Sequence, residues 1–493
     1  MIKYLCILLI LLSAAAVGHS NTIPAAGDAG NVAITPPPPD STSTCFSGDF
    51  YRWIWGKQQR ATEQGELASH YSECNLDRLC DIYSQVLDIE IDQNNTQAIY
   101  SLLSHVSQAC LDDFINVHQR KRPFVLMNEQ PWGENEIQAN LSDSTSFPSA
   151  HAEIVWSTAL ALAQMAPHQQ DTILKRAIEC ANSGVITGAH WQSDVDAALI
   201  YGSAALAKAQ GSDLFPSLMA AARSEYMQLT GLSESDLTAP FPSLVKILDA
   251  PPTADDYFFA SDLFKFWQSK ELRSTERGEM ANNDESMTDD YLVSIFAACS
   301  PVVTISESNT PQIVMLIKAL KLSLYTLTQN LKSIIYRERP YVKYNEPVVY
   351  GSYDWSVFFE SSYPSRHALI GWGIALALAE VMHDCQNVLL KRGYEYGESR
   401  IIKGSSYASD VHAARIMAAC YLSKLHNETL FKNLFANAKA EYQQKLDEAG
   451  IESIVATSRI NDKLWYSISG IIYKTKPTTP GIYIHNGKKV TIK

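Results

Sequence analysis

The sequence predicts an all-α protein built from two tandem helical-bundle domains, and two patterns lead to this prediction. The first pattern is the helical spacing of apolar residues, which is found in nearly every part of the chain. The clearest apolar faces are formed by Ile154, Leu162 and Met165 and, in the second half, by Ile370, Ile374, Leu378 and Val381. Strand-like sequence appears only in the tail, where residues 481–485 and 490–492 could form a hairpin around Asn486 and Gly487. A chain of 493 residues is long enough for two domains.

The second pattern is an internal repeat, in which three short motifs occur twice in the same order. The first copy is Arg122-Pro123, then Pro148-Ser149-Ala150-His151, then Ser183-Gly184 followed by His190 and Asp194. The second copy is Lys332 with Arg339-Pro340, then Pro364-Ser365-Arg366-His367, then Ser399-Arg400 followed by Asp410. Both the motif-two histidines and the motif-three aspartates are 216 positions apart, and Arg122 and Arg339 are 217 apart. Two copies of this length indicate a tandem duplication, because a solenoid has shorter and more numerous repeats.

These motifs, together with composition, divide the chain into segments. We expect the first repeat at residues 45–232, a linker at 233–247, the second repeat at 248–450 and a C-terminal tail at 451–493. Residues 1–20 are predicted to be a secretory signal peptide, because Lys3 precedes an apolar run and small residues follow it. Residues 21–44 are rich in Pro, Ser and Thr and are expected to be a linker or a surface arm. The protein is therefore expected to be periplasmic or secreted.

Composition limits the kinds of partner and cofactor that we expect the protein to bind. The net charge of −13 makes nucleic acid an unfavourable partner. An uncleaved membrane anchor is the rival interpretation of the N-terminus, but its apolar run is shorter than the roughly 20 residues that a span needs. The cysteines after the signal peptide permit disulfides, most readily among the four that lie in the stretch from Cys45 to Cys110, whereas Cys180, Cys299 and Cys420 have the apolar contexts of buried thiols. No cysteine or histidine cluster has zinc spacing, so we expect no metal and no cofactor.

The second copy carries a set of side chains suited to holding phosphate. Lys332 and Arg339 are seven positions apart, so one helix ending at Pro340 would project both from the same face. Arginine binds two phosphate oxygens at once, and lysine adds a point charge. Ser365 precedes an apolar helical run, and its neighbouring amides are expected to form an anion-binding helix N-terminus, with His367 in the first turn. Arg400 completes this phosphate-binding set.

The first copy carries the groups that make and break bonds. His190 and Asp194 are four apart, so on one helix the carboxylate could hold the imidazole in one tautomer and activate its other nitrogen. His151 could protonate a leaving oxygen, while Arg122 and Ser149 hold phosphate oxygens. These roles describe phosphoryl transfer to a histidine without a metal.

These motifs resemble those of the type-2 phosphatidic acid phosphatase and vanadium haloperoxidase superfamily, and within it most resemble the bacterial class A nonspecific acid phosphatases. The family pattern is Lys-x6-Arg-Pro, then Pro-Ser-Gly-His, then Ser-Arg-x5-His-x3-Asp. The resemblance covers nearly all of residues 35–450. It implies an all-helical fold, export to the periplasm, a phosphohistidine intermediate and hydrolysis of phosphate monoesters at acidic pH.

Each copy departs from the family pattern in a different way. In the first repeat, Ile115 replaces the motif-one lysine and Gly184 replaces the motif-three arginine. In the second repeat, Ser406 replaces the nucleophilic histidine, although Asp410, which would orient it, remains. Arg366 replaces the glycine of the second motif, and a side chain of this size could fill the pocket or contact the ligand. His118 lies four positions before Arg122 and could supply part of the missing charge in the first repeat.

We therefore expect an exported, metal-independent acid phosphatase that acts on small phosphomonoesters, with any turnover in the first repeat. The second repeat would be a non-hydrolytic phosphate binder or a structural partner, and the tandem would form an intrachain pseudo-dimer. The main alternative is a pair of pseudoenzymes that bind phosphorylated ligands without turnover. A vanadium haloperoxidase and an exchange of third motifs between the repeats are less favoured alternatives.

Overall fold

The computed structural model describes residues 33–71, 75–113, 118–130, 132, 144–346 and 359–449, and in the tail residues 465–467, 472–473, 476, 481–485 and 488–492. The chain divides into two compact units, one up to Glu441 and one from Tyr442 onward. The predicted signal peptide, the first part of the predicted arm and Ile115 lie outside the described residues.

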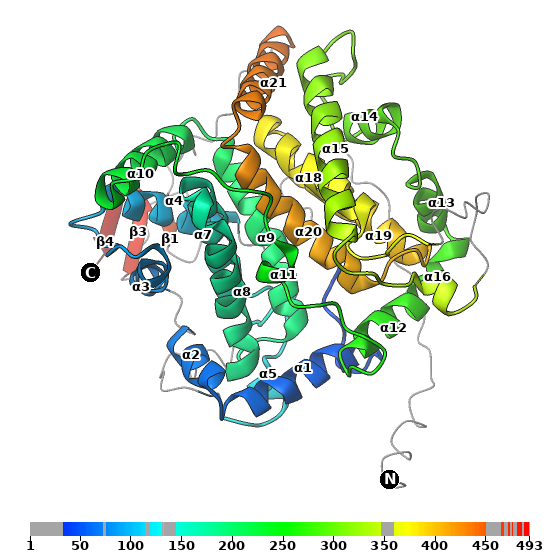
Figure 1. Cartoon of the computed structure of the whole chain (residues 1–493). Helices are drawn as coiled ribbons and strands as arrows, with labels where there is room; N and C mark the ends of the chain where they lie inside the picture. The colour runs from blue at the N-terminus through cyan, green and yellow to red at the C-terminus, as the bar shows by residue number, and fades with distance from the viewer. Residues whose placement is uncertain are drawn as a thin grey trace. The chain divides into compact units, whose positions relative to one another are not determined.

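Every secondary-structure element described in the first unit is a helix (Figure 1). Its first half contains α1 (Phe46–Gln59), α2 (Glu63–Tyr71), α3 (Leu76–Leu87), α4 (Gln97–Asp113), α5 (Pro123–Leu126), α7 (Ala150–Met165), η1 (Pro167–Gln169), α8 (Gln170–Thr187), α9 (Gln192–Gln210), α10 (Phe215–Thr230) and α11 (Leu244–Ile247). Its second half contains α12 (Phe259–Ser269), η2 (Lys270–Ser274), α13 (Glu276–Asn283), α14 (Asp289–Ala297), α15 (Pro311–Lys332), α16 (Pro340–Lys343), α18 (Arg366–Val381), α19 (Gln386–Ile402), α20 (Ala408–Leu425) and the start of α21 (Thr429–Glu448). The predicted all-α class is confirmed for this unit.

The core lies where α7 and α9 meet α18 and α20 (Figure 1). Both α7 and α18 are buried along nearly their whole length, which explains why their sequences are apolar on all sides. Within each half, α7 also packs on α8, and α18 packs on α19. Because the two halves share this core, they form one compact unit rather than two separable ones.

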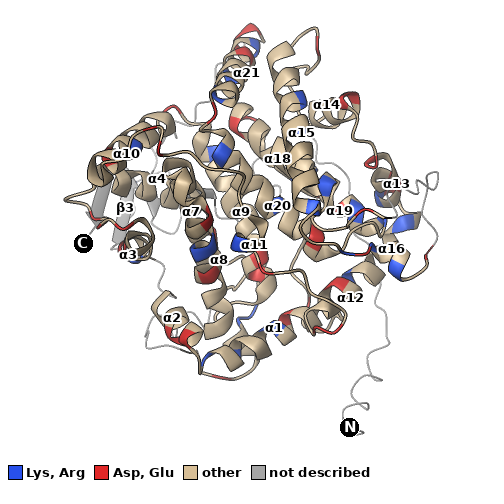
Figure 2. Cartoon of the chain, viewed as in Figure 1, with Lys and Arg blue, Asp and Glu red and all other residues tan. Residues whose placement is uncertain are grey.

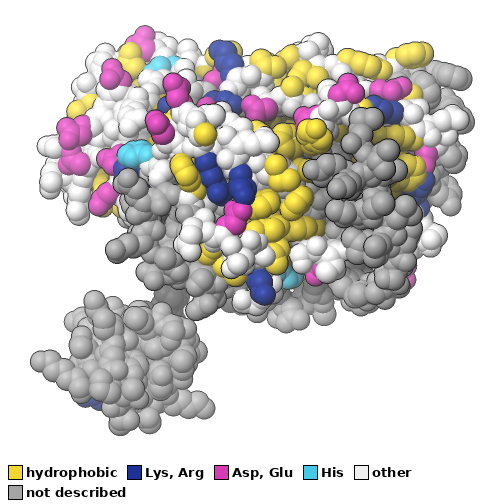
Figure 3. All heavy atoms as spheres, turned by 90° about the horizontal axis from the view of Figure 1, so that it is seen from below, with side chains coloured by type: hydrophobic (Ala, Val, Ile, Leu, Met, Phe, Trp, Pro, Cys, Tyr) yellow, Lys and Arg dark blue, Asp and Glu magenta, His cyan; other side chains and the backbone are white. Residues whose placement is uncertain are grey.

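Helices α1 and α12 make a second contact between the two halves. The ring of Tyr51 lies 5.9 Å from that of Tyr257, and the guanidinium of Arg52 lies 3.5 Å from the centre of the Phe258 ring. The helices approach closely here, since a Cβ on Gly48 would come within 2.6 Å of the Ser261 side chain. Figure 3 shows the molecule from this side, where exposed apolar side chains surround a few charged ones.

The second unit contains a small antiparallel sheet with strand order β2-β1-β3-β4. The predicted hairpin is confirmed, with β3 (Gly481–His485) paired to β4 (Lys488–Ile492). The strands β1 (Trp465–Ser467) and β2 (Ile472–Tyr473) were not predicted, because each is too short to show an alternating pattern.

The prediction of one helix running from Lys332 to Arg339 is wrong. Helix α15 ends at Lys332, and Arg339 is the N-cap of the next helix, α16. Pro340 begins α16 instead of ending a helix, because the first helical position needs no N–H. Among the described helices, none combines the length and the apolar character that a membrane crossing requires.

Candidate active site

The second motif of the first repeat lies at the N-terminus of α7, as predicted. Ser149 is the N-cap residue, and its Oγ accepts a hydrogen bond from the Ala152 N–H at 3.3 Å. Its own N–H donates to the backbone oxygen of Asp194 at 3.2 Å, which joins the second motif to the third. His151 stands in the first turn with 8% of its surface exposed.

His151 is neutral over most of the acidic range. Its Nε2–H donates to the Cys180 carbonyl at 3.2 Å, and its Nδ1 is buried with no hydrogen-bond partner in the described part of the chain. Burial lowers the pKa of His151 to about 4. A leaving-group acid must carry a proton, so His151 could act as one only when a bound phosphate raises this pKa.

The tautomer of His190 follows from its two hydrogen bonds. A guanidinium can only donate, so the Nε2 of His190 accepts from Arg122 Nη1 at 3.1 Å. A carbonyl can only accept, so Nδ1 carries the hydrogen and donates to Ser146 at 2.8 Å. Burial, together with the nearby Arg122 charge, holds the pKa of His190 well below its usual value. The nitrogen that faces the motif-one arginine is therefore unprotonated even at mildly acidic pH.

Asp194 does not hold His190 in the way the sequence predicted. His190 lies in the turn before α9, so the two residues are not four apart on one helix. The carboxylate is 3.9 Å from His190 Nδ1, and it accepts instead from the Trp191 N–H at 2.8 Å and from Arg120 at 2.5 Å. Burial raises the pKa of Asp194 to about 7, although Arg120 opposes this rise. Asp194 therefore positions the turn that carries His190, and the Ser146 carbonyl orients the ring.

Sequence reasoning missed a buried ion cluster behind this turn. Arg120 bridges Asp194 and Asp49 at 2.5 and 2.6 Å, and Ser193 donates from both its backbone N–H and its hydroxyl to Asp49. The same cluster occurs behind the second site, where Arg337 bridges Asp410 and Asp262 at 2.6 and 2.8 Å. The sequence does contain a signal for these clusters, since Arg120 and Arg337 each stand two positions before the motif-one arginine of their repeat.

Arg122 supplies positive charge to the first site. It is 6% exposed and donates to the Ala189 carbonyl, the Thr145 carbonyl and the Ser144 hydroxyl. Burial lowers its pKa to about 10, so it is charged at any pH of interest. His118 lies outside any helix, where its carbonyl accepts from Thr145 and its ring contacts Phe147. No described contact joins the His118 side chain to Arg122 or His190, so its predicted role as a substitute cation lacks support.

Gly184 packs directly on the His190 ring. A Cβ at this position would lie 3.0 Å from His190 Cδ2, which is tighter than ordinary contact. The ring is held from two sides by Ser146 and Arg122, so it has little room to move. A side chain at position 184 would therefore require the His190 ring to shift by a few tenths of an ångström.

The second site has the same backbone frame. Ser365 is the N-cap of α18, and its N–H donates to the Asp410 carbonyl at 3.0 Å. Arg339 donates to the Ser405 carbonyl at 2.8 Å, as Arg122 does to Ala189. The Ser406 N–H donates to the Arg400 carbonyl, as that of His190 does to Gly184. Each motif-one arginine contacts its own third motif, so the structure contradicts an exchange between repeats.

Buried positive charge dominates the second site. The buried cations are Lys332, Arg339 and Arg400, which are 9%, 6% and 6% exposed. Lys332 and Arg339 both donate to the Ser361 carbonyl, so they converge although they are not on one helix. Burial and the nearby Arg339 lower the pKa of Lys332 to about 7. Figure 2 shows Lys and Arg gathered around α16 and α19.

Two further contacts complete the second site. Glu360 accepts from Arg339 at 3.1 Å and also from Arg366, so it neutralises part of the charge. His367 Nε2–H donates to the Glu285 carbonyl at 3.0 Å, and burial with Arg400 holds the pKa of His367 well below its usual value. The side chain in the nucleophile position is Ser406, which is 2% exposed.

The predicted buried thiols are confirmed, because Cys180, Cys299 and Cys420 are buried and unbonded to another cysteine. The predicted bridge within 45–110 stays a prediction, since Cys74 lies outside the described residues. Across the described part of the chain, no three or more His, Cys, Asp or Glu side chains come together as metal ligands would.

Comparison with known proteins gives the family. A model of the PAP2 superfamily matches residues 97–209, a range that includes Arg122, His151, His190 and Asp194. A non-specific acid phosphatase of Providencia stuartii is 32% identical over 203 residues, which are 40% of this chain and 82% of the relative. An acid phosphatase of Zymomonas mobilis subsp. mobilis is 31% identical over 199 residues, 40% of this chain and 74% of the relative. A non-specific acid phosphatase of Salmonella typhi is 29% identical over 201 residues, 40% of this chain and 79% of the relative. With this identity and coverage, the chain belongs to the PAP2 superfamily, among the bacterial non-specific acid phosphatases.

Proposed function

We propose that this protein is an exported acid phosphatase that hydrolyses small phosphate monoesters through a phosphohistidine intermediate formed in the first repeat. The observation that carries the proposal is the state of His190, whose Nε2 is unprotonated and faces Arg122. A nucleophile must offer a lone pair toward the phosphorus, and here that lone pair lies beside a cation that attracts phosphate. Export rests on the predicted signal peptide and on the relatives.

The reaction would proceed in two steps at the first site. Arg122 and the N–H groups at the start of α7 hold the phosphate oxygens, and binding shifts the Arg122 contact from His190 to the substrate. His190 Nε2 then attacks phosphorus, the P–O bond to the alcohol breaks, and His151 gives a proton to the departing oxygen. Water next attacks the phosphohistidine and gives a proton back to His151, so the P–N bond breaks, phosphate leaves, and both His190 and His151 are restored. The Ser146 carbonyl stabilises the positive charge that develops on the ring.

The two repeats are proposed to have diverged from one duplicated unit into different roles. The matching contacts at equivalent positions support a duplication, and they include the Arg120 and Arg337 clusters. The second repeat has Ser406 where a nucleophile is needed, so it is proposed to bind phosphate without turnover, as half of an intrachain pseudo-dimer. Losing a covalent nucleophile costs about 10⁶ in rate.

A second candidate function is a pair of phosphate-binding pseudoenzymes. Gly184 leaves the first site without one cation, and each lost charge-stabilising donor costs about 10²–10³ in rate. The cations of the second site, which remain together, favour binding over turnover.

The test is hydrolysis of an aryl phosphate between about pH 4 and pH 7 without added metal. We expect activity in the parent protein and in Ser406→Ala, and none in His190→Ala, which is the matched change in the other repeat. Acid quenching of the parent with a radiolabelled phosphate monoester should trap acid-labile label on the protein. A parent protein that binds phosphate but releases no alcohol would establish the pseudoenzyme alternative instead.

A further inference from the structure

Glu380, His426 and Lys439 form an ionic cluster, which we call the Glu380 cluster, outside both proposed phosphate sites. Glu380 stands near the end of α18 and is 5% exposed. One of its carboxylate oxygens lies 2.7 Å from His426 Nε2, and the other lies 2.7 Å from Lys439 Nζ. His426 is the C-cap of α20, and its ring stacks on Phe435 of α21 with the ring centres 4.7 Å apart. A buried carboxylate thus holds two basic side chains, one from α20 and one from α21.

The contacts of His426 require a charged ring. Its Nδ1 lies 2.8 Å from the Leu422 carbonyl, which can only accept, so Nδ1 carries a hydrogen. Its Nε2 faces the Glu380 carboxylate, which also only accepts, so Nε2 carries a second hydrogen. Burial opposes this charge, but Glu380 raises the pKa of His426 above its usual value. Burial likewise opposes the charge on Glu380, but His426 and Lys439 lower the pKa of Glu380 to about 2.

Charged groups on the neighbouring helices are paired with each other. These pairs are Arg223 with Glu234 and Lys424 with Glu428. From the first repeat, α7 and α9 bring the neutral side chains of Gln164 and Gln210 to this region. The charges that act most strongly on His426 are those of Glu380 and Lys439.

Lys439 connects the Glu380 cluster to the first repeat. Its amino group donates to the backbone oxygen of Gln210 at 2.9 Å. Gln210 is the last residue of α9, the helix that begins just after His190. The two repeats approach closely here, since a Cβ on Gly211 would lie 2.9 Å from the Glu380 backbone oxygen. The Glu380 cluster therefore holds one end of the helix whose other end supports the proposed nucleophile.

The residue after His426 makes a second contact between the repeats. Asn427 Nδ2–H donates to the Gln164 carbonyl at 3.0 Å, and the Asn427 side-chain oxygen accepts from Arg223 at 2.6 Å. A cavity of about 20 Å³ beside this contact is lined by Gln210 of the first repeat and by His426 of the second. The position of His426 is therefore coupled to hydrogen bonds that cross from one repeat to the other.

The first repeat has a neutral pair at the equivalent positions. Gln164 stands 216 positions before Glu380, which is the offset of the motifs. Gln210 stands 216 positions before His426, and its Nε2–H donates to Gln164 Oε1 at 2.9 Å. The fold therefore accepts an uncharged pair at this place, and the ionic pair is specific to the second repeat.

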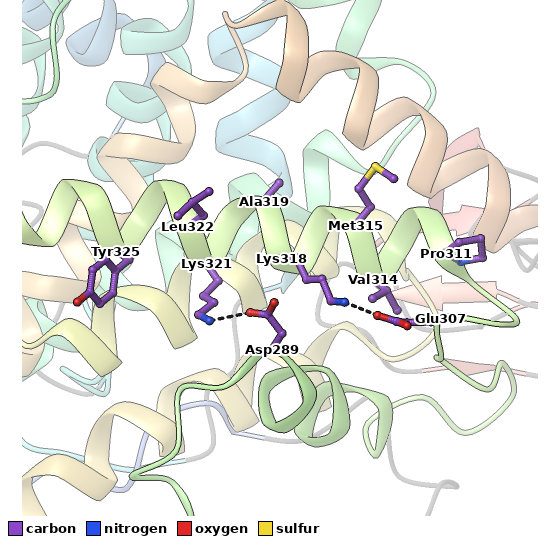
Figure 4. Close-up of a pocket in the computed structure, with 10 residues that line it drawn as sticks. All are labelled: Asp289, Glu307, Pro311, Val314, Met315, Lys318, Ala319, Lys321, Leu322 and Tyr325. Carbon is purple, nitrogen blue, oxygen red and sulfur yellow. Dashed lines mark hydrogen bonds and ion pairs between the residues drawn. The ribbon is translucent and has the colours of Figure 1, made fainter.

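Burial distinguishes the Glu380 cluster from ion pairs on the surface. Figure 4 shows two such pairs on α15, Lys318 with Glu307 and Lys321 with Asp289. Exposed pairs of this kind contribute little to stability, because water competes for both charges. Loss of one charge from a buried pair is more costly, because the remaining charge is left without compensation. The protonation of His426 should therefore have a measurable effect on stability.

We propose that the Glu380 cluster is a pH-dependent clamp that holds the two repeats together in mildly acidic solution and weakens once His426 loses its proton. A histidine with a raised pKa stabilises the folded protein fully below about pH 6.5, and this contribution is lost as pH rises through the folded-state pKa. A glutamate with a lowered pKa contributes above about pH 4.3, and this contribution is lost as pH falls toward 2. The clamp is therefore strongest between about pH 4.3 and 6.5, whether or not the first site turns over.

The first test observes the proton on His426 directly. The full chain, labelled with ¹³C at histidine Cε1, is titrated by NMR, and the His426 signal is assigned by its absence from His426→Gln. We expect this signal to titrate above about pH 6.5. Lys439→Met, which changes a side chain that is 30% exposed, should move the titration to still higher pH because a nearby cation is removed. Titration at or below about pH 6.5 in the parent protein, or no shift in Lys439→Met, would overturn the proposal.

The second test measures the effect on stability. The double variant Glu380→Gln/His426→Gln gives the second repeat the pair that the first repeat already has. The midpoint of urea unfolding, followed by circular dichroism, should fall between about pH 6.5 and pH 8.5 in the parent protein, and the double variant should lose most of this fall. A double variant whose midpoint falls as much as that of the parent would contradict the clamp.

His412→Gln is the matched control. His412 lies 3.6 Å from Asp196 of the other repeat, but burial lowers the pKa of His412, so its ring carries little charge in the folded protein over this pH range. This variant should keep the full fall of the parent. Equal loss of the fall in His412→Gln and in the double variant would show that any histidine between the repeats has this effect, and the Glu380 clamp would be rejected.

Discussion

Replacing Arg120 with methionine tests whether the buried ion cluster holds the first site together. Arg120 bridges Asp49 and Asp194 at 2.6 and 2.5 Å, and none of the three side chains is more than 9% exposed. Methionine nearly matches the length of the arginine stem but carries no charge, so two buried carboxylates lose their cation. Breaking a buried pair in this way costs about 3–5 kcal/mol, and we expect this loss in the free energy of unfolding near pH 7.

The loss should depend on pH in a defined direction. Burial already raises the pKa of Asp194 to about 7, and removal of Arg120 would raise it further. A carboxyl whose folded-state pKa exceeds its unfolded value of about 3.9 binds more protons when folded, so its contribution to stability falls as pH rises between the two values. With Arg120 this carboxyl titrates near pH 7 and without Arg120 only at higher pH, so the two folded proteins differ in proton binding mainly above pH 7, and the defect of Arg120→Met should be smaller near pH 7 than near pH 9.

Arg337→Met is the matched control, because Arg337 bridges Asp262 and Asp410 in the same way behind the second site. Urea unfolding followed by circular dichroism at both pH values should show a similar loss of stability for the two variants. Aryl phosphate hydrolysis should fall at least tenfold only in Arg120→Met, since only its turn carries His190, and a tenfold loss corresponds to about 1.4 kcal/mol. Equal loss of hydrolysis in both variants while both remain folded, or no loss of stability in either, would refute this reasoning.

Three further predictions concern single groups. Because the folded-state pKa of His151 is about 4, the unfolded chain binds more protons between about pH 4 and 6.5, and the free energy of unfolding falls as pH drops through this range. His151→Asn should remove up to about 3 kcal/mol of that fall, as measured by urea unfolding, and an unchanged dependence on pH would contradict this prediction. Phosphate binding near pH 8 should take up a proton at Lys332, whose pKa is about 7 in the empty site, and calorimetry in buffers of different ionisation enthalpy should show uptake that Lys332→Met lacks. Gly184→Ala should lower kcat, because the new Cβ would lie 3.0 Å from the His190 ring. Steady-state kinetics with an aryl phosphate measure this change, and a higher kcat would contradict the prediction.

The helical fold was predictable because its central helices have apolar patterns that admit no strand. The pairing of α7 and α9 with α18 and α20 into one core was not predictable, since periodicity shows that a helix face is buried but not against which partner. The break between Lys332 and Arg339 was missed for a related reason. Seven-residue spacing suits a helix, but a proline can equally begin one, and the tertiary contacts with Ser361 decide between these outcomes.

At the site, motif spacing identified residues that the structure brings together, but it assigned one hydrogen-bond partner wrongly. The Ser146 carbonyl orients His190, and backbone groups of this kind leave no mark in a sequence. Asp194 was visible as a motif residue, yet its actual partners, Arg120 and the Trp191 N–H, depend on where α9 begins. Because α9 begins at Gln192, two residues after His190, the carboxylate accepts from the Trp191 N–H and not from the imidazole.

The two sites share the contacts that support them but differ in the side chains that could act on phosphate. The ion clusters of Arg120 and Arg337 have nearly the same geometry, and the backbone bonds around His190 and Ser406 match as well. Side chains at the two sites differ, since Gly184 and His190 stand where the second repeat has Arg400 and Ser406, and a Cβ on Gly184 would lie 3.0 Å from the His190 ring. Breaking a buried ion pair costs several kcal/mol, so the ion clusters are expected to persist in both repeats whether or not the site still turns over. The second site keeps Lys332, Arg339 and Arg400 without a nucleophile, and this arrangement is the one expected if the second repeat binds phosphate as proposed.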